Sequence, residues 1–266
     1  MRSWNIAHRG GAALMPENTL AAFADAKARG CDGVELDVQL SADGVVVVHH
    51  DFRLMACVAR KDGRWLAAPG LRIKDLILEE LRRYDIGHPE PGSSYALKHP
   101  LVRSIEAMVP TLAEVVALAS SSFRLMVELK CDGSEDSADP LALAEAAYAV
   151  TGGDAIYVGF DWRALVPLVA RGAACWFTTD KLQGDARPVI DAVAAAGGQG
   201  WFPNFPDATP DNIAYARARG LKVGAWTVND SADMARLSDL DAICTDRPDL
   251  LKELQSRKTA TTRPLA

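Results

Sequence analysis

The sequence predicts a (β/α)8 TIM barrel, because short apolar runs alternate with helical ones and eight of those runs fit parallel strands. Alternation of strands with amphipathic helices is typical of a parallel sheet covered by helices. The 266 residues match the usual size of one such barrel. Apolar residues make up 49% of the chain, enough for one large core. We therefore expect a single barrel domain over residues 1–255.

Nine apolar, β-leaning runs are candidate strands. They are Trp4–Ala7, Gly33–Asp37, Val45–His49, Leu125–Leu129, Ile156–Phe160, Cys175–Thr178, Gly200–Phe202, Lys222–Thr227 and Ala242–Thr245. Between most of them lie Ala-rich stretches with helical character, such as TLAAFADAKARG and DPLALAEAAYAV. Several of these stretches stop at a glycine, which helix ends favour, as at Gly30 and Gly172.

The third of these runs is the one that we expect to lie outside the parallel set. Asp43 and Gly44, just before it, are a strong signal for a two-residue hairpin turn. A tight hairpin joins antiparallel strands, whereas parallel neighbours need long crossovers. Residues whose numbers add up to about 86 should then face each other, which places His49 opposite Asp37. Eight parallel strands remain, as a (β/α)8 barrel requires.

Residues 52–110 interrupt the alternation and form a small insertion after the hairpin. They contain a short helix around Lys74–Tyr84 and then IGHPEPGSSYALKHP, which is rich in Pro, Gly and Ser. Long segments of this kind are either functional or disordered. A surface excursion and a cap over the barrel mouth are therefore both open interpretations. We expect residues 256–266 to form a flexible tail.

Composition excludes some partners and favours one location. The net charge of −6 leaves no basic surplus for a nucleic-acid backbone, and it argues against docking on an anionic membrane. The N-terminal MRSWNIAHRG has no long apolar stretch, so we expect no signal peptide and no stable membrane insertion. Five scattered cysteines without a CxxC pair indicate reduced thiols, and hence a cytoplasmic protein.

Charged side chains gather at the expected carboxyl ends of the strands, where barrel enzymes carry their chemistry. These residues are His8, Arg9, Glu35, Asp37, His50, Glu128 and Lys130. Three carboxylates in apolar strands would repel one another unless a cation lay between them. An all-oxygen ligand set of Glu35, Asp37 and Glu128 suits Mg²⁺ or Ca²⁺ better than zinc. Structural ion pairs with Arg9 or Lys130 are the alternative for any single carboxylate.

Two histidines and two cations complete this pattern. His8 and His50 are candidates for a general acid and base, since imidazole titrates near neutral pH. Arg9 and Lys130 are fixed cations of the kind that a phosphate anion needs, beside a metal that activates an attacking hydroxyl or water. The set therefore predicts cleavage of a phosphodiester. His49 should point away from His50 and pack.

Aromatic residues lie near two other strand ends. Trp226, within GAWTVN, and Phe160, within VGFD, are candidates for the substrate pocket. Filling space in the core is the equally open interpretation for both of them. Trp201 and Phe202, within GWFPN, are weaker candidates of the same kind.

Seven motifs, in order from His8 to about Pro248, closely resemble the glycerophosphodiester phosphodiesterases. They are HRG, PENT, ELDVQLSADGVVVVHHD, PTLAEV, VELK, GAWTVN and ICTDRPD. The resemblance implies a (β/α)8 barrel with an insertion after the second histidine. It also implies hydrolysis of glycerophosphodiesters, such as glycerophosphocholine or glycerophosphoethanolamine, to glycerol 3-phosphate and an alcohol with Mg²⁺ or Ca²⁺.

The resemblance also implies a role for each matching residue. His8 and His50 correspond to the acid and base, and the metal ligands are Glu35, Asp37 and Glu128. The substrate contacts are Arg9, Lys130 and Trp226. Glu17, in PENT, corresponds to a carboxylate that supports the site, although a charge at a helix start is an equal alternative.

Two departures from the family pattern concern the leaving alcohol. FRLMACVARKDGRW follows Asp51 where the family usually has an Arg/Thr/Gly-rich stretch, and Gly159 replaces a serine. One alternative function is a lysophospholipase D-like enzyme of the same site chemistry, which would need an exposed apolar surface near residues 52–110. A non-catalytic phosphate-binding barrel is another, but binding alone does not need both His8 and His50.

Overall fold

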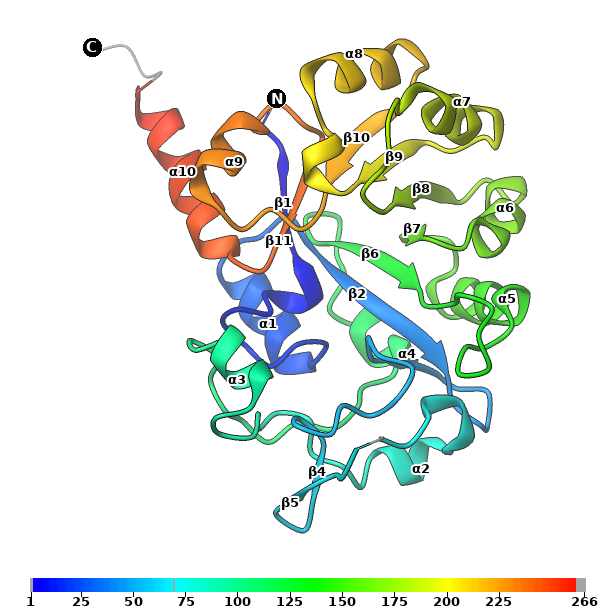
Figure 1. Cartoon of the computed structure of the whole chain (residues 1–266), viewed down its shortest axis with the longest axis vertical. Helices are drawn as coiled ribbons and strands as arrows, with labels where there is room; N and C mark the ends of the chain where they lie inside the picture. Colours follow the sequence, from blue (N-terminus) through cyan, green and yellow to red (C-terminus); the bar gives the residue numbers. More distant parts are fainter. Residues whose placement is uncertain (1, 69, 262–266) are drawn as a thin grey trace.

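Eight parallel strands form a closed barrel in the computed structural model, which describes residues 2–68 and 70–261 (Figure 1). The barrel strands are β1 (Trp4–Ala7), β2 (Gly33–Leu40), β6 (Arg124–Leu129), β7 (Ile156–Gly159), β8 (Ala174–Thr179), β9 (Gly200–Pro203), β10 (Lys222–Ala225) and β11 (Ala242–Thr245). Each strand pairs in parallel with its neighbour, and β1 closes the barrel by pairing with both β2 and β11. The predicted (β/α)8 fold is confirmed.

Helices lie outside the barrel, between its strands (Figure 1). They are α1 (Leu20–Ala28), α4 (Leu112–Val116), α5 (Pro140–Thr151), α6 (Trp162–Ala170), α7 (Arg187–Ala195), α8 (Pro210–Ala218), α9 (Ser231–Arg236) and α10 (Pro248–Thr261). Side-chain oxygens cap many of their N-termini, as Thr19 does for α1 and Asp139 for α5. Gly30 follows the end of α1 with a φ of 73°, the conformation that made glycine a predicted helix stop there.

The C-terminal helix extends further than the sequence suggested. α10 continues to Thr261, within the stretch 256–266 that we expect to be a flexible tail. The helix is fixed to the base of the barrel by the buried Leu251 and by Gln255, whose Nε2 donates to the Ser3 carbonyl at 2.9 Å. Once anchored there, its backbone ladder can continue past the contact. Residues 262–266 lie outside the described residues.

The hairpin after β2 has the register that the sequence predicted. β3 (Val46–Val48) pairs antiparallel with β2, and Val38 faces Val48 while Leu40 faces Val46. The next step along this ladder is a hydrogen bond of 2.9 Å from the His49 N–H to the Asp37 carbonyl. β3 therefore delivers the His49–Asp51 corner to the end of β2 that carries Asp37.

The insertion of residues 52–110 lies at the bottom of Figure 1 and folds around a small core of its own. Its elements are β4 (Arg60–Lys61), β5 (Arg64–Trp65), the 3₁₀ turn η2 (Ile73–Asp75), α2 (Leu78–Leu81) and α3 (Ser94–Lys98). Leu54, Ile73, Leu81 and Tyr95 are among the buried residues of this core, which also includes Val47 of β3. The expected helix near Lys74–Tyr84 is thus split between η2 and α2.

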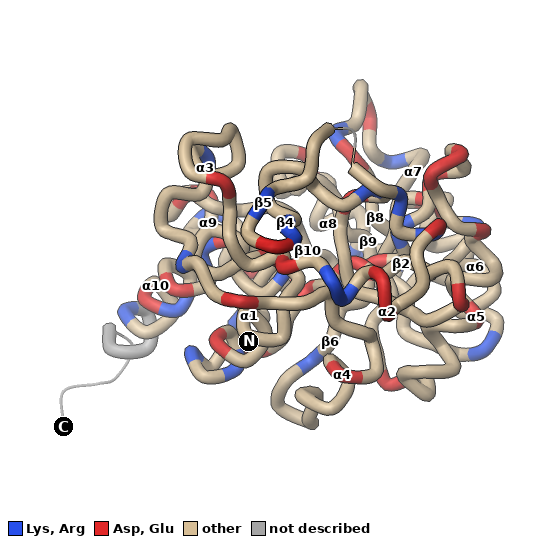
Figure 2. The backbone as a smooth tube through the Cα atoms, turned by 90° about the horizontal axis from the view of Figure 1, so that it is seen from below, with Lys and Arg blue, Asp and Glu red and all other residues tan. Residues whose placement is uncertain are grey.

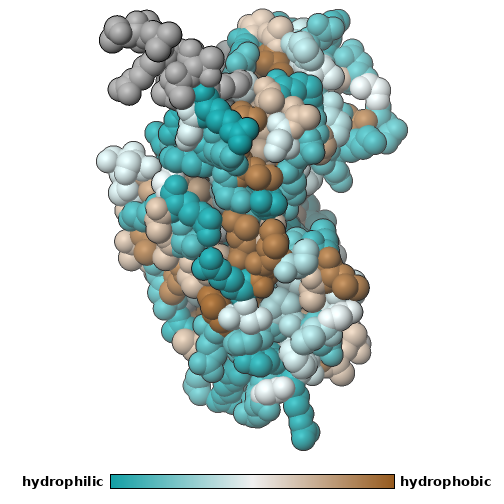
Figure 3. Space-filling view, turned by 90° about the vertical axis from the view of Figure 1, so that its left-hand side faces the viewer, coloured by the Kyte–Doolittle hydropathy of each residue, from teal (hydrophilic) through white to brown (hydrophobic). Residues whose placement is uncertain are grey.

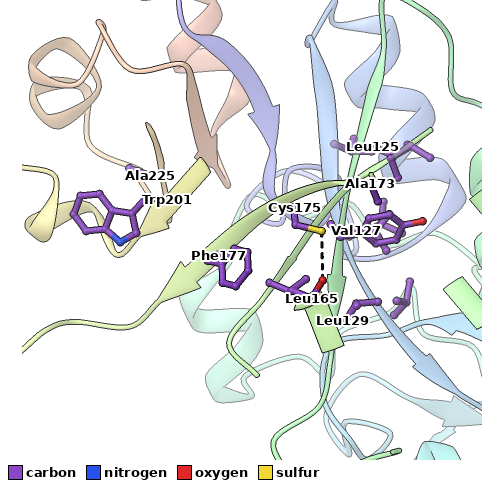
Figure 4. Close-up of a cluster of buried hydrophobic side chains, with 14 of the residues drawn as sticks. Leu125, Val127, Leu129, Leu165, Ala173, Cys175, Phe177, Trp201 and Ala225 are labelled. Carbon is purple, nitrogen blue, oxygen red and sulfur yellow. Dashed lines mark hydrogen bonds between the residues drawn. The ribbon is translucent and has the colours of Figure 1, made fainter. Parts of the chain in front are cut away.

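Two layers of apolar side chains flank the barrel wall. Outward-facing side chains of β6 and β8 pack under the helices, where Cys175 lies beside Leu165 of α6 (Figure 4). Residues of the opposite strand face form a second cluster that includes Trp176 and Phe202. Trp201, which we also considered for the pocket, is fully buried in the first layer, and Phe202 is buried in the second. Both fill the core.

The surface mixes polar and apolar groups. Figure 2 shows basic and acidic residues interspersed along the backbone, including the insertion. Figure 3 shows apolar groups among hydrophilic ones on the side of the molecule that carries α1, α3 and α10. Within residues 2–68 and 70–261, no helix has the length and apolar character needed to cross a bilayer.

Candidate active site

Three carboxylates from β2 and β6 meet at one end of the barrel. Glu35 and Asp37 lie two residues apart on β2 and therefore share a face of the strand. Asp37 pairs with Glu128 in the parallel register between β2 and β6. One oxygen atom from each of these residues lies within 4.8 Å of the other two. The sequence-predicted ligand set is thus assembled at one place.

This cluster has unused acceptor atoms. Glu35 and Asp37 are only 2% and 0% exposed. Glu35 Oε1 and Asp37 Oδ1 nevertheless accept no hydrogen bond from the described residues. Burial, and then the charges of Asp37 and Glu128, raise the pKa of Glu35 well above its ordinary value. Buried carboxylate oxygens without donors are costly, and a divalent cation with oxygen ligands would satisfy them. These residues therefore fit such an ion.

Two basic side chains border the carboxylates. Arg9, two residues after the end of β1, has a φ of 50°, and its Nε lies 3.4 Å from Asp37 Oδ2. Lys130 Nζ donates to Glu128 Oε1 at 2.8 Å and lies 3.8 Å from Asp37 Oδ1. Burial disfavours the charged form of both bases, but the carboxylates outweigh it and raise the pKa of each. Ion pairing is thus present, yet it leaves the Glu35 Oε1 atom without a donor among the residues described.

Glu17 and a residue of the insertion, Tyr95, hold the Arg9 side chain in place. Its Nη1 donates to Glu17 Oε1 at 3.0 Å, and the Tyr95 hydroxyl donates to Glu17 Oε2, also at 3.0 Å. Tyr95 lies on α3 and is 7% exposed. Glu17 therefore supports the site rather than serving only as a charge near a helix start. The insertion reaches the carboxylate cluster through this chain of contacts.

His8 lies between two carboxylates. Its Nδ1 is 2.6 Å from Asp246 Oδ1, and its Nε2 is 3.8 Å from Glu35 Oε2. Asn229 Nδ2 donates to the other oxygen of Asp246 at 2.7 Å. Burial alone would raise the pKa of Asp246, but the hydrogen bond and charge of His8 lower it to about 2. An ionised Asp246 favours a proton on Nδ1 and leaves Nε2 directed at the cluster.

His50 has a similar partner on the other side. Its Nδ1 lies 2.6 Å from Asp51 Oδ1. Burial alone would raise the pKa of Asp37, but the nearby charges of His50, Arg9 and Lys130 together lower it below its ordinary value. Thus the His50 ring also lies near the carboxylates.

The corner that carries His50 is fixed by backbone contacts. Gln39 Nε2 donates to the carbonyls of His49 at 2.8 Å and Asp51 at 2.7 Å. His49 is buried, and its Nδ1 lies 2.9 Å from the Asp51 carbonyl. The side chain of His49 therefore packs into this corner, as expected for its position on the strand.

The two candidate pocket aromatics lie beside Lys130. Phe160 and Trp226 meet edge to face with their ring centroids 5.3 Å apart. Phe160 is 41% exposed, and Lys130 Nζ lies 5.9 Å from the centre of its ring. Trp226 Nε1 donates to the Phe202 carbonyl at 3.2 Å, which fixes that ring. Together they form an aromatic ledge next to Lys130.

Several supporting residues were missed by reasoning from the sequence. Asp246 follows β11 directly, so the same strand-end position that identified His8 could have identified it. Asn18 has a φ of 56°, and its Nδ2 donates to Asp37 Oδ2 at 2.8 Å. Asn229 lies in an irregular segment and Tyr95 on the five-residue helix α3, and neither is part of a stretch long enough for a periodic pattern to give a signal.

Comparison with known proteins decides the family. Residues 8–250 match the model of the Glycerophosphoryl diester phosphodiesterase family. The chain belongs to this family. A glycerophosphodiester phosphodiesterase of Caldanaerobacter subterraneus is 29% identical over 265 residues, which cover 96% of this chain and 98% of that protein.

Solved structures agree with this assignment. A Silicibacter pomeroyi protein, provisionally named a glycerophosphoryl diester phosphodiesterase, superimposes with a TM-score of 0.87 at 29% identity, covering 95% of this chain and 93% of that one. An Oleispira antarctica phosphodiesterase in complex with its product sn-glycerol-3-phosphate has a TM-score of 0.74 at 26% identity, with 96% of each chain covered. The chain is thus an enzyme of the glycerophosphodiester phosphodiesterase class, as its motifs predicted.

Proposed function

We propose that this enzyme hydrolyses small glycerophosphodiesters, such as glycerophosphocholine or glycerophosphoethanolamine, to glycerol 3-phosphate and an alcohol with the help of a divalent cation. The observation that carries the proposal is the buried carboxylate cluster, in which Glu35 Oε1 and Asp37 Oδ1 accept no hydrogen bond from the described residues. Two histidines that each contact an aspartate flank this cluster. The related Oleispira antarctica phosphodiesterase, whose structure holds sn-glycerol-3-phosphate, supports the identity of the product.

Glu35, Asp37 and Glu128 would hold the cation, for which their all-oxygen set favours Mg²⁺ or Ca²⁺. When bound, such an ion neutralises phosphate charge and makes a nearby hydroxyl more acidic. Arg9 and Lys130 lie at the border of the cluster and would contact the remaining phosphate oxygens. The substrate is a small molecule, and the Phe160–Trp226 ledge would contact its carbon atoms.

The histidines would move the protons. One Nε2 accepts the proton of the attacking group, and the other donates a proton to the leaving alcohol oxygen. In the first step the attacking group is the neighbouring glycerol hydroxyl, which gives a cyclic phosphate; water then opens the ring with the proton transfers reversed. Asp246 and Asp51 orient the two rings and stabilise each imidazolium while it exists.

A direct test measures glycerol 3-phosphate release from a panel of diesters. We expect release from glycerophosphocholine and glycerophosphoethanolamine when Mg²⁺ or Ca²⁺ is present. A bis-alkyl phosphate without a neighbouring hydroxyl, followed by release of its alcohol, should react much more slowly, because it lacks the internal nucleophile. Binding of these diesters without turnover would instead indicate a non-catalytic phosphate-binding barrel and overturn the proposal.

Replacing Tyr95 with phenylalanine should weaken substrate binding more than it slows turnover. The change removes the donor to Glu17 Oε2 and so loosens the support of Arg9. A hydrogen bond to a charged group is worth about 1.5 kcal/mol, and only the part of it that orients Arg9 affects binding, so KM should rise by no more than roughly tenfold. Because Arg9 would hold the phosphate in both ground and transition states, kcat should change less than KM. Steady-state kinetics measure both constants.

Tyr84→Phe is the matched control for this experiment. Tyr84 also lies in the insertion, where its ring contacts Lys61, away from Glu17. Its variant should keep the KM of the unmodified enzyme. An unchanged KM in Tyr95→Phe, or an equal rise in both variants, would show that the insertion does not act through Arg9.

A further inference from the structure

An open groove of about 510 Å³ lies directly beside the candidate catalytic residues. His50 and Lys130 are among the residues that line it, together with Phe52, Met55 and Ala56 of the chain that follows His50. This chain is the stretch in which the sequence departs from the usual family pattern. The reaction proposed above uses His50 and Lys130 but leaves the groove itself without a role.

The groove presents mainly apolar surface. Leu54 is buried in the core of the insertion and anchors the segment from below. Its neighbours Phe52, Met55 and Ala56 are only partly buried and line the groove. A half-exposed apolar wall next to a reaction centre is a surface to which a carbon chain can bind favourably.

Charged side chains at the groove form ion pairs with one another. Arg53 donates from Nε and Nη2 to the two oxygens of Asp136 at 2.7 and 2.9 Å, and Arg72 Nη1 lies 3.7 Å from the same carboxylate. Asp136 therefore has no surplus negative charge for an ammonium group. Phe52 is the one aromatic residue among the described residues of the lining, so no aromatic cage for a quaternary ammonium is formed.

The wall is also fixed in position. Arg53 Nη1 donates to the Gly70 carbonyl at 3.1 Å, while its other nitrogens bind Asp136 in the loop after β6. At Gly70 the chain passes so close to Leu54 that a Cβ would lie 1.8 Å from the Leu54 carbonyl oxygen. These contacts hold this part of the wall in place before a ligand binds, which lowers the entropic cost of binding.

We infer that this groove binds an apolar carbon chain of the substrate, attached to the phosphodiester that lies between His50 and Lys130. The inference rests on the proposed function and adds to its substrate class diesters that carry such a chain. Free hydroxyls of glycerol and the cationic head of choline would find few partners along this wall. The chain has two chemical sources: the alkyl part of the leaving alcohol, or an acyl group on the glycerol.

Two series of esters distinguish these sources. The first comprises glycerol 3-phosphate esterified with ethanol, butanol or hexanol. The second keeps the ethyl ester and carries a butanoyl or hexanoyl group on the primary hydroxyl of the glycerol. In the series whose chain enters the groove, kcat/KM should rise about two- to fourfold for each added methylene, mostly through KM. The other series should be flat.

Variants of the wall connect this dependence to the groove. Phe52→Ser removes apolar surface and Ala56→Asp adds a charge, so each should reduce the dependence on chain length to less than twofold per methylene. Leu97→Ser is the control, because Leu97 is an exposed leucine of the insertion that does not line the groove. It should keep the full dependence. With two wall variants, one that fails to fold still leaves the other to be measured.

The outcomes separate the groove from the proposed function. If every ester is hydrolysed and neither series depends on chain length, the inferred role of the groove is wrong. The proposed function is then retained. If no ester is hydrolysed, the proposed function fails. Calorimetric titration of the same uncleaved esters then tests the groove, and an affinity independent of chain length overturns it.

Discussion

Replacing His8 or His50 with alanine should lower kcat at least about 100-fold, the usual scale for loss of a general acid or base, while leaving the fold intact. The two rings approach the carboxylate cluster from different strands, and each contacts its own aspartate at 2.6 Å. Neither ring is fully buried, since the side chains of His8 and His50 are 15% and 29% exposed. Loss of either ring should therefore remove a proton transfer and affect turnover far more than the stability of the fold.

The insertion provides a matched control for these variants. His88 also contacts an aspartate at 2.6 Å, through Nδ1 to Asp85 Oδ2, but it does so in the insertion, away from the cluster. His88→Ala should keep a rate close to that of the unmodified enzyme. Turnover of glycerophosphocholine and circular dichroism would be measured for all three variants. A near-native rate in His8→Ala or His50→Ala would show that the assigned role of that histidine is wrong.

The parts of the site that lie on regular elements could be predicted, because strand geometry constrains them. A period of two places Glu35 and Asp37 on one face, and the Asp43-Gly44 turn sets the hairpin register that brings His49 opposite Asp37. Parallel neighbours in a closed barrel then bring Glu128 to the same end. The functional roles of these side chains remain predictions, but their convergence follows from the fold.

The parts contributed by the insertion and by loops could not be predicted in this way. Tyr95 reaches Glu17 from an insertion whose path depends on tertiary packing around its own small core. The strands β4 and β5 have two residues each, too few for alternation to be seen in the sequence. The groove beside His50 also depends on contacts between distant loops, such as that of Arg53 with Asp136. Local patterns carry no information about such contacts.

Removing divalent cations should abolish activity, and adding Mg²⁺ or Ca²⁺ back should restore it. The reason is that Glu35 and Asp37 each bury an oxygen without a donor among the described residues, so the carboxylates are left uncompensated in chelator. Activity is measured after treatment with EDTA and dialysis, and calorimetry measures binding of each ion alone. Undiminished hydrolysis in chelator, together with no heat of ion binding, would remove the cation from the reaction.

Thermal unfolding gives a second readout that does not depend on catalysis. An ion at about 100 times its Kd stabilises the folded state by about 2.7 kcal/mol, which raises Tm by roughly 5–10 °C for a chain of this size. Burial and the neighbouring carboxylates raise the pKa of Glu35 above the ordinary value of 4.5. Its ionisation therefore costs folded-state stability increasingly as pH rises above that value in chelator. Bound cation offsets this cost, so the gain in Tm should be larger at pH 8 than at pH 5.

Glu35→Gln makes this argument specific to one side chain. The amide keeps the shape of the glutamate but cannot ionise, so it should weaken cation affinity while avoiding the cost of a buried charge. In chelator at pH 8 the variant should unfold at a higher temperature than the unmodified enzyme, whereas in saturating cation the order should reverse. Such a reversal is expected only if ionised Glu35 destabilises the folded state in the absence of the ion and binds the ion when it is present. If the variant is less stable under both conditions, Glu35 has a structural role only and is not a ligand of the cation.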